Sequence, residues 1–401
     1  MQTKIMPRIN ITTVPNLLKN FLTCFFKGEV FIGTAIKKFE AEFAKYCGVK
    51  NAISVSSGRD GMRLILKSLN LKKKDEIIFP AYTLVDLPLI GKEMGLKPVF
   101  VDVDLKTFNI IPNLIEEKIT KRTKVIIATH LFGLPCDIEK IIKVAERHKL
   151  IVIEDCAHSV GAEFERKKVG SFGTAAIFSF ELRKPINTLG GGMITTNDNE
   201  LATKVKTRLE SNYSYKIIFK KLFIYFLERF LLNTILYTPI AYLLHSKFKE
   251  KVIAFYQKYH THSKSSRFNF TNFQAILGIE QLKNLDLSNE RRIKAAKVLT
   301  RLLEKNNLLF LPRSTRNSKH IYYSYAITSK YDGDSISQKL FKLGIDTAIG
   351  NEIMQNCPKK LGIKERFPNT EMIIKTAIQL PFHNEISEKD IQLIHTALNK
   401  L

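Results

Sequence analysis

Asp155 stands at the end of an apolar run, Ile151-Val-Ile-Glu-Asp155-Cys-Ala-His158. Such a run predicts a buried strand, and ligands bind beyond the carboxyl ends of the strands in open parallel sheets. A carboxylate in that place can pair with a cationic ring nitrogen of a bound cofactor. The alternative is that Asp155 only caps the turn that follows the strand.

Lys184 follows a second apolar run, Ile177-Phe-Ser179-Phe180, and precedes three glycines at positions 190–192. Burial behind a strand favours the neutral amine, which can attack an aldehyde. Ser179 lies within the run, and its hydroxyl could hydrogen-bond a phosphate. Since the chain contains 63 lysines and arginines, the alternative for Lys184 is an ordinary solvated side chain.

A third pattern, Val55-Ser-Ser57-Gly58-Arg59-Asp60, is typical of a strand–turn–helix junction. Backbone N–H groups at the N-terminus of a helix bind phosphate, and glycine allows a ligand to approach the chain closely. The motif is short, so a plain tight turn is the alternative. Along the chain, the three patterns predict a phosphate cradle, then a partner for a ring nitrogen, then a nucleophilic lysine.

The elements that position these residues alternate between short apolar runs and helical patterns. We expect strands at 53–57, 76–79, 98–103, 124–129, 150–154, 175–180 and 193–196, with helical stretches between them that include 112–120 and 137–148. This rhythm predicts a doubly wound, mostly parallel α/β sheet with helices on both faces. Residues 1–284 are expected to form this large domain. Residues 285–401, in which 320–328 resembles a strand, are expected to form a small α+β domain.

The segment 213–264 interrupts this pattern as an apolar, helical insert. Its apolar residues cover nearly the whole circumference of a helix, and Pro239 is expected to turn the chain. No apolar run approaches the roughly 18 residues that a membrane-spanning helix needs. Two interpretations remain open. The insert packs against the large domain or a dimer partner, or 216–244, flanked by lysines, lies flat in a membrane interface.

The composition is that of a folded and strongly basic protein. The chain has 401 residues, of which 45% are hydrophobic and 25% charged, and its formal net charge is +25. The excess positive charge reflects a general lysine bias, or else it attracts anionic substrates such as nucleotide sugars or an anionic membrane. The lysines are scattered and no zinc-finger, homeodomain or RNA-recognition signature occurs, so nucleic-acid binding is not expected.

Cysteine usage bears on the location of the protein. The five cysteines are widely spaced and form no CxxC pair, which predicts neither a disulfide framework nor a metal site. Residues 1–10 lack the apolar stretch of a secretory signal. We therefore expect a protein of the reducing cytoplasm.

In their order and spacing, these patterns resemble the DegT/DnrJ/EryC1/StrS family of sugar aminotransferases. Members of that family are fold-type-I enzymes that use pyridoxal 5'-phosphate (PLP). The resemblance extends from about Gly33 to the C-terminus, except for the insert. The matching pieces are Phe31-Ile-Gly33, Ser57-Gly58, Asp75-Glu-Ile-Ile-Phe-Pro80, Pro98-Val-Phe-Val-Asp102, His130-Leu-Phe-Gly133, Glu154-Asp155-Cys-Ala-His158, Phe178-Ser-Phe180, Lys184, Gln274-Ala275, Gly278, Gln281-Leu282 and Leu380-Pro381.

The resemblance implies a role for each candidate residue. Lys184 would form a Schiff base with the cofactor and then shuttle a proton, and Asp155 would hold the pyridine nitrogen. His158 would lie near the ring oxygen. The remaining cofactor contacts would come from Gly58, Ser179, the N–H groups of Arg59 and Asp60, and Arg267 of a partner subunit. The family's active site lies at a dimer interface, so the resemblance also implies a homodimer.

Several positions depart from the family's pattern. Arg59 replaces the threonine of Ser-Gly-Thr, Leu84 replaces an aromatic residue that often stacks on the cofactor, and Gly190 replaces the glutamate of Gly-Glu-Gly-Gly. Arg267 stands where the family has an asparagine. These departures motivate one alternative, a PLP-fold regulator without turnover.

The present lysine favours transamination over the dehydration that family members with histidine in its place perform. The resemblance therefore implies transfer of an amino group from glutamate to a keto-sugar, with a nucleotide as its carrier, in surface polysaccharide or glycolipid biosynthesis. A lipid-linked or membrane-associated substrate is the second alternative. His130, Tyr82 and Arg183 are expected to line the substrate pocket, although His130 could equally be a satisfied core histidine.

Overall fold

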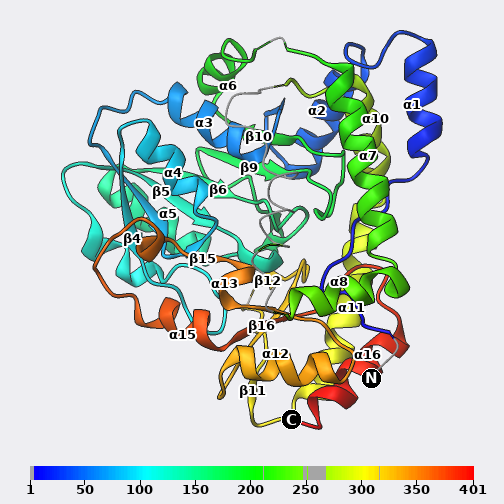
Figure 1. The fold of residues 1–401 in the computed structure, drawn as a ribbon. Helices are drawn as coiled ribbons and strands as arrows, with labels where there is room; N and C mark the ends of the chain where they lie inside the picture. Colours follow the sequence, from blue (N-terminus) through cyan, green and yellow to red (C-terminus); the bar gives the residue numbers. More distant parts are fainter. Residues whose placement is uncertain (1–3, 211, 247–250, 252–267, 316) are drawn as a thin grey trace.

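The centre of the protein is a seven-stranded sheet with helices on both faces (Figure 1). The computed structural model describes residues 4–210, 212–246, 251, 268–315 and 317–401. In sheet order, the strands are β1 (Asn51–Val55), β10 (Gly192–Thr196), β9 (Ala175–Ser179), β6 (Ile151–Asp155), β5 (Thr123–Thr129), β2 (Glu76–Pro80) and β4 (Lys97–Val101). The neighbouring strands β9, β6, β5, β2 and β4 are all parallel to one another. β10 is antiparallel to both of its neighbours, β1 and β9. The predicted α/β class with a mostly parallel sheet is confirmed.

Side chains of the central strands are buried on both faces of the sheet. In β5, Ile127 packs with the helices of one face, and the adjacent Ile126 packs with those of the other. This alternation explains why the strands appear in the sequence as continuous apolar runs. One face is covered by α3 (Gly58–Ser68), α4 (Asp86–Glu93) and α6 (Asn199–Lys206), and the other by α2 (Ala35–Cys47), α5 (Ile138–His148) and α10 (Asn272–Lys283).

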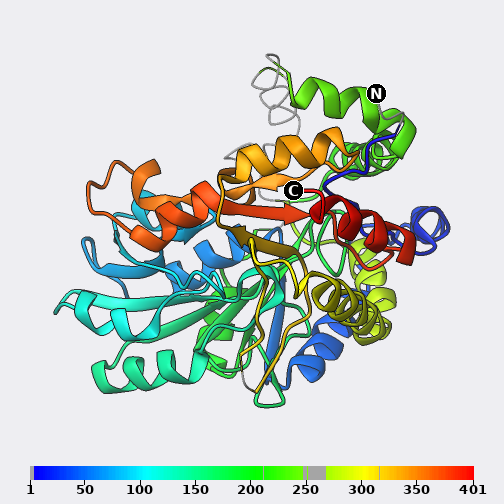
Figure 2. The same ribbon diagram turned by 90° about the horizontal axis from the view of Figure 1, so that it is seen from below.

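A second, four-stranded sheet follows later in the chain. Its order is β11 (Leu309–Phe310), β13 (Tyr325–Ser329), β16 (Ala377–Leu380) and β14 (Ala348–Ile349). Its helices are α11 (Leu285–Leu303), α12 (Gly333–Lys342), α15 (Pro368–Thr376) and α16 (Glu388–Leu398). Figure 2 shows this smaller part, in yellow to red, beside the large sheet. The predicted domain boundary at residue 285 stays a prediction. Met6, near the N-terminus, forms a β-bridge with Ile345 of the smaller part.

Short elements lie between the longer helices and strands. They are β3 (Tyr82–Thr83), β7 (Glu163–Phe164), β8 (Lys167–Lys168), β12 (Ser318–Lys319), β15 (Gln355–Asn356), α13 (Gly350–Ile353) and α14 (Cys357–Lys360), with 3-10 turns at Pro112–Leu114, Glu116–Lys118 and Leu131–Gly133. β15 pairs with β3, and β12 pairs with β7. These pairings tie segments after residue 310 to the loops at the ends of the large sheet.

The insert begins with two helices, α7 (Tyr215–Leu231) and α8 (Thr234–Leu244), and α7 lies beside the N-terminal α1 (Leu17–Phe26). The prediction that Pro239 turns the chain is wrong, because Pro239 lies inside α8. The turn comes earlier, at Asn233, whose side chain caps α8 by accepting the Ile235 N–H. Residues 247–250 and 252–267 lie outside the described part of the chain. In the part that is described, no helix is long and apolar enough to cross a membrane.

Two further expectations need correction. The stretch 112–120 forms two 3-10 turns instead of a helix, because Ile119 is already extended and leaves too few residues to propagate one. The stretch 320–328 is strand only from Tyr325 onward. Tyr322 has a left-handed backbone with φ of 48°, which interrupts the pairing before β13.

Candidate active site

Three of the sequence patterns meet at the carboxyl ends of β6 and β9. Asp155 ends β6, Ser179 ends β9, and Asp155 pairs in register with Ile177 of β9. The start of α3 lies against the same end of β9. A Cβ atom placed on Gly58 would lie 3.3 Å from the Phe178 carbonyl oxygen and 3.4 Å from Cβ of Ser179. A side chain at this position would be tightly packed against β9, so glycine favours the close approach of α3 to Ser179.

The start of α3 offers backbone donors for an anion. The Ser57 hydroxyl caps the helix by accepting the Asp60 N–H at 3.1 Å, so that this N–H is engaged in the cap. The N–H groups of Gly58 and Arg59 come before the first intrahelical bond and have no partner within the helix. Together with the Ser179 hydroxyl and the positive end of the helix dipole, they form a set of donors suited to phosphate. The Arg59 side chain turns to Asp86 of α4 instead, at 2.6 Å.

Lys184 and His158 lie on a shared aromatic ring. The Lys184 Nζ lies 5.0 Å from the centroid of the Tyr323 ring. The Tyr323 ring stacks on His158, with centroids 4.4 Å apart and planes 23° from parallel. His158 is half-buried, and desolvation and the Lys184 charge both lower its pKa well below the usual value, so that its imidazole is neutral. Among the described residues, Nδ1 of His158 has no hydrogen-bond partner.

Asp155 is a buried carboxyl group in the same region. Burial raises its pKa above the usual value, and the opposing effects come first from the Ala157 N–H and then from the Lys184 charge. Its Oδ1 accepts that Ala157 N–H at 3.1 Å. The carboxyl group thus caps the turn after β6, as the alternative held, and a cation that enters the site would also favour its ionised form.

The loop that carries Lys184 is restrained by segments far away in sequence. Thr12 donates its N–H to the Leu182 carbonyl at 3.0 Å and its hydroxyl to the Lys184 carbonyl at 2.7 Å. On the other side, the Gln274 amide group of α10 donates to the carbonyls of Thr188 and Gly190. Because these buried backbone groups are satisfied, the loop between β9 and β10 is held in one conformation.

Gln281 completes the restraint of this loop. Its amide group exchanges two hydrogen bonds with the backbone of Asn187, at 2.9 and 2.7 Å. Gln274 and Gln281 were recognised in the sequence only as matching pieces of the family pattern. In the structure, both serve the loop that presents the lysine.

The place beside Gly190 is filled by two side chains from elsewhere. A Cβ atom on Gly190 would lie 3.3 Å from Nζ of Lys221 and 3.6 Å from both carboxylate oxygens of Glu181. Burial lowers the pKa of Lys221, and the charge of Glu181 opposes that shift. Lys221 belongs to α7 of the insert, so the insert reaches the loop of Lys184. A carboxylate is therefore present beside residue 190 although residue 190 itself has none.

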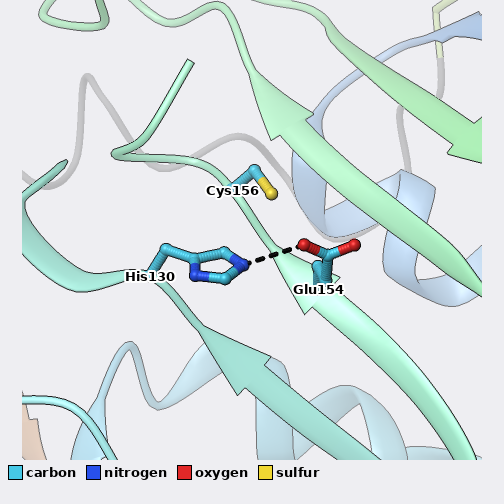
Figure 3. A group of neighbouring side chains, drawn as sticks. All are labelled: His130, Glu154 and Cys156. Carbon is cyan, nitrogen blue, oxygen red and sulfur yellow. Dashed lines mark hydrogen bonds and ion pairs between the residues drawn. The ribbon is translucent and has the colours of Figure 1, made fainter. Parts of the chain in front are cut away.

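Two of the expected pocket residues belong to the core. Tyr82 is fully buried and its hydroxyl donates to the Gly350 carbonyl at 2.8 Å. His130 is also fully buried and lies next to Glu154 and Cys156 (Figure 3). Its Nδ1 accepts the Cys136 N–H at 3.1 Å, so its Nε2 carries the proton that is donated to Glu154 at 3.0 Å.

The cluster of His130, Glu154 and Cys156 is explained without a metal ion. Both oxygens of Glu154 also accept backbone N–H groups, from Gly170, Phe172 and Gly173. A metal ion would have to displace these bonds and would leave buried donors unsatisfied. The cluster is a hydrogen-bonded part of the core, as the alternative for His130 held.

The other expected residues lie closer to the surface. Arg183 is partly exposed and lies 3.7 Å from Glu228 of α7. Leu84 is exposed and follows β3 directly. Arg267 lies outside the described residues.

Tyr323 was not identified from the sequence. It belongs to the segment that was interpreted as a strand, where a tyrosine is an ordinary residue. The sequence pointed to this contact only indirectly, through Gly133 in one of the pieces that match the family. A Cβ atom on Gly133 would lie 2.8 Å from the Tyr323 backbone nitrogen. The Ile321 N–H donates to the Gly133 carbonyl at 3.0 Å. Gly133 thus allows the Tyr323 backbone to come close to the site.

The side chains at this site fit PLP. The start of α3 with Ser179 suits its phosphate, and Asp155 suits a protonated ring nitrogen. Nδ1 of His158, which has no hydrogen-bond partner in the part of the chain that the structure describes, suits a ring oxygen. The Lys184 amine, beside the same aromatic ring as His158, suits the aldehyde. The fit rests on the donors present and on the absence of a side chain at Gly58.

Comparison with known proteins also points to an aminotransferase. A family model described as the DegT/DnrJ/EryC1/StrS aminotransferase family matches residues 15–399. A dTDP-3-amino-3,6-dideoxy-alpha-D-galactopyranose transaminase of Aneurinibacillus thermoaerophilus is 32% identical over 376 residues, which are 93% of this chain and 92% of that protein. A GDP-perosamine synthase of Caulobacter vibrioides is 30% identical over 381 residues, 92% and 91% of the two chains. The fold is shared with Helicobacter pylori PseC, an aminotransferase involved in the biosynthesis of pseudoaminic acid, with a TM-score of 0.80, 21% identity and 99% of each chain covered.

Proposed function

The chain belongs to the DegT/DnrJ/EryC1/StrS aminotransferase family, and on that premise we propose that it moves an amino group from glutamate to a keto-sugar carried by a nucleotide. Aminotransferases of this family are PLP-dependent enzymes of fold type I. The observation that carries the proposal is the convergence of Lys184, Asp155 and His158 beside the start of α3. The product would serve surface polysaccharide or glycolipid biosynthesis.

We assign the cofactor site to residues that meet there. Lys184 and Asp155 are the catalytic residues. The cofactor contacts are Asp155, Lys184, Gly58, Arg59, His158 and Ser179, with Arg267 supplied by the partner in a homodimer. Asp60 is not among them, because its N–H donates to the Ser57 hydroxyl. When bound, PLP supplies an electrophilic carbon and a ring that withdraws electrons from the substrate.

The protein groups have separate tasks in this proposal. Lys184 Nζ would take the proton from the α-carbon of the amino donor, and PLP, when bound, would supply the carbon that can receive it. Asp155, held as a carboxylate by the cationic ring nitrogen, keeps that nitrogen protonated. The restraints from Thr12, Gln274 and Gln281 limit the positions that Lys184 can take. Orientation of this kind lowers the entropic part of the barrier.

A nucleotide-linked substrate is supported by charge and by the relatives. The net charge of +25 attracts polyanions such as a sugar with a diphosphate. The two relatives above are named for dTDP- and GDP-linked sugars, so the proposal extends to the nucleotide-linked class and to no single base. A lipid-linked acceptor keeps the same chemistry and is the alternative.

We also propose that the protein works in the cytoplasm and contacts the membrane surface peripherally. All five cysteines are free and buried, which suits a reducing compartment. Two observations argue against the regulator alternative: the chain has both Lys184 and Asp155, and the Glu181 carboxylate lies beside Gly190.

An absorption spectrum of the purified protein with PLP tests this function. The wild type should show a visible band of the lysine-bound cofactor, and glutamate should convert it to the shorter-wavelength amine form. Lys184→Ala should lack the band and the conversion, whereas Lys330→Ala, which changes an exposed lysine, should keep both. A nucleotide-linked keto-sugar should then restore the band in the wild type. A wild type without the band would overturn the assignment of Lys184.

A further inference from the structure

The helices α1 and α7 each carry two apolar sides. On each helix, one apolar side is buried against the rest of the protein and the other is exposed. In α7, Ile218, Leu222 and Tyr225 are buried against α1 and α10. One residue further along the helix lies a second stripe, Phe219, Phe223 and Phe226, which is exposed. This explains why apolar residues cover nearly the whole circumference in sequence: the fold uses one stripe and leaves the other in water.

The exposed sides of the two helices join into one surface. We call it the outer face, and its members are Leu18, Leu22, Phe25 and Phe26 of α1 with Tyr215, Phe219, Phe223, Phe226, Leu227 and Phe230 of α7. Phe25 contacts Tyr215 with ring centroids 6.1 Å apart, and the buried Phe21 contacts the exposed Phe219 with centroids 5.6 Å apart. Figure 1 shows α1 and α7 together at one edge of the molecule.

The exposure of these side chains is large for a protein in water. Phe26 is 81% exposed, Phe223 65% and Phe230 63%. Single exposed apolar residues are common on protein surfaces, but contiguous patches of this kind mark sites of association. Phenylalanine is also a residue that interfacial helices insert into the boundary between lipid headgroups and acyl chains.

The charges around the outer face are mostly positive. Lys19, Lys27, Lys216, Lys220 and Arg229 are exposed on or beside the two helices. In the described sequence of α1 and α7 the only carboxylate is Glu228, which is buried and lies near Arg183. Glu29, just after α1, is the nearest exposed acidic residue along the chain. Long basic side chains beside an apolar surface can reach the headgroup level while their stems lie along it.

We propose that the outer face docks on an anionic lipid bilayer, with α1 and α7 lying in the interface. The proposal deepens the proposed peripheral location and does not depend on the proposed chemistry. A bilayer with negative headgroups complements both the apolar stripe and the basic rim. A second copy docking face to face would instead bring like charges together, which disfavours self-association through this surface.

Flotation of the full-length protein with vesicles tests the proposal. One vesicle set contains phosphatidylcholine alone, and the other contains phosphatidylcholine with phosphatidylglycerol. The wild type should float with the anionic vesicles and remain below with the neutral ones, and salt should weaken the binding. A wild type that stays at the bottom of the gradient with anionic vesicles would sink the proposal.

Matched variants place the contact on the outer face. Phe223→Ser/Phe230→Ser should lower vesicle binding at least tenfold, since each ring contributes apolar area to the interface. Phe310→Ser changes a phenylalanine of the small sheet that is 50% exposed and should bind like the wild type. Lys216→Glu/Lys220→Glu should lose the preference for anionic lipid. Equal flotation of the wild type and the double serine variant would contradict the proposal.

Sedimentation and absorption spectra distinguish membrane docking from self-association and from a failure of the proposed enzyme activity. Sedimentation of each variant without lipid should show the same mass as the wild type. A change from dimer to monomer on Phe223→Ser/Phe230→Ser would show that a second copy covers the face and would overturn the lipid assignment. The spectral change of the PLP-loaded protein with glutamate should be unaffected by these variants, so that a failure of the membrane proposal is distinguishable from a failure of the proposed function.

Discussion

Tyr323 stacks on His158 with ring centroids 4.4 Å apart, and the amine of Lys184 lies 5.0 Å from the centroid of the same tyrosine ring. The two stacked residues come from different parts of the chain, one after β6 and one before β13. Gly133 makes the approach possible, because a side chain there would collide with the Tyr323 backbone. The tyrosine therefore acts as a positioning residue for His158.

Removing the ring of Tyr323 should weaken cofactor binding. Tyr323→Ala should lower the affinity for PLP by up to about tenfold, because an aromatic stack contributes on the order of 1 kcal/mol. Tyr323→Phe keeps the ring and should stay within about twofold of the wild type. Titration followed by absorbance measures both, and the band position reports the environment of His158. Tyr331→Ala, at an exposed tyrosine, is the control. Unchanged affinity and band in Tyr323→Ala would refute the positioning role.

Asp155→Asn should remove the part of the pH dependence of PLP binding that comes from this carboxyl group. Burial raises the pKa of Asp155 in the free protein, whereas a cationic ring nitrogen would lower it, so binding releases a proton. The affinity for PLP should therefore increase as the pH rises from about 4, the ordinary pKa of an aspartate, through the raised pKa of Asp155. The variant should lose this dependence and lower the rate of the glutamate half-reaction by at least about a hundredfold.

The same substitution should stabilise the cofactor-free protein at neutral pH. A folded-state pKa above the unfolded value means that ionisation of Asp155 opposes folding at every pH above the unfolded value. Asn removes that cost, and thermal unfolding measures the gain. Asp198→Asn, at a helix cap where asparagine serves equally well, is the control and should change neither property. A less stable Asp155→Asn would contradict the role of burial.

Thr12→Val should affect turnover without touching the cofactor. Valine keeps the shape of threonine but removes the hydroxyl that donates to the Lys184 carbonyl. We expect a loss of about 1 kcal/mol in stability and a slower half-reaction, with PLP affinity unchanged. Stopped-flow spectra and thermal unfolding measure the two effects. Thr13→Val removes a hydroxyl that donates to exposed Glu385 instead, and should behave like the wild type. A normal rate in Thr12→Val would mean that the N-terminal segment does not restrain the lysine.

Asp346 should control how stability depends on acid pH. It accepts two hydrogen bonds from Arg8 at 2.7 Å and one from His245 of the insert at 2.8 Å, and it contacts the Tyr237 hydroxyl. Burial acts to raise its pKa, but these hydrogen bonds and the Arg8 charge outweigh burial and lower it. Its contribution to stability is therefore complete above the unfolded pKa of about 4 and is lost as the pH falls through the lower folded value.

Asp346→Asn should remove that acid-dependent part. The variant loses the charge-assisted hydrogen bonds from Arg8 and His245, whereas Glu352 still pairs with Arg8 at 2.6 Å, so we expect a loss of about 2 kcal/mol at neutral pH. Unfolding measured between neutral and acid pH should show a flatter profile in the variant. Asp334→Asn, an exposed carboxylate that accepts a bond from Gln338, is the control. A variant as stable and as acid-sensitive as the wild type would exclude Asp346 as the group responsible.

Much of the fold was predictable because its signals are local. The strands of the large sheet are buried on both faces, so their residues form apolar runs that can be recognised without partners, as in β5 and β6. The exceptions also have local causes. Pro239 lies within a helix whose packing of Tyr237 and Ala241 outweighs its cost, and Tyr322 breaks a strand through one left-handed residue.

The sequence by itself determined the chemical groups and the elements that carry them: a lysine, a buried carboxylate and a helix start beyond the strands of a parallel sheet. Only the tertiary structure decided which distant segments serve these groups. Thr12 reaches the Lys184 loop, Tyr323 reaches His158, and Lys221 of the insert reaches Gly190. It also decided which stripe of α7 is covered. The physical reason is that hydrogen bonds and packing between remote segments depend on the folded path of the chain, whereas periodicity and residue type report only local conformation and burial.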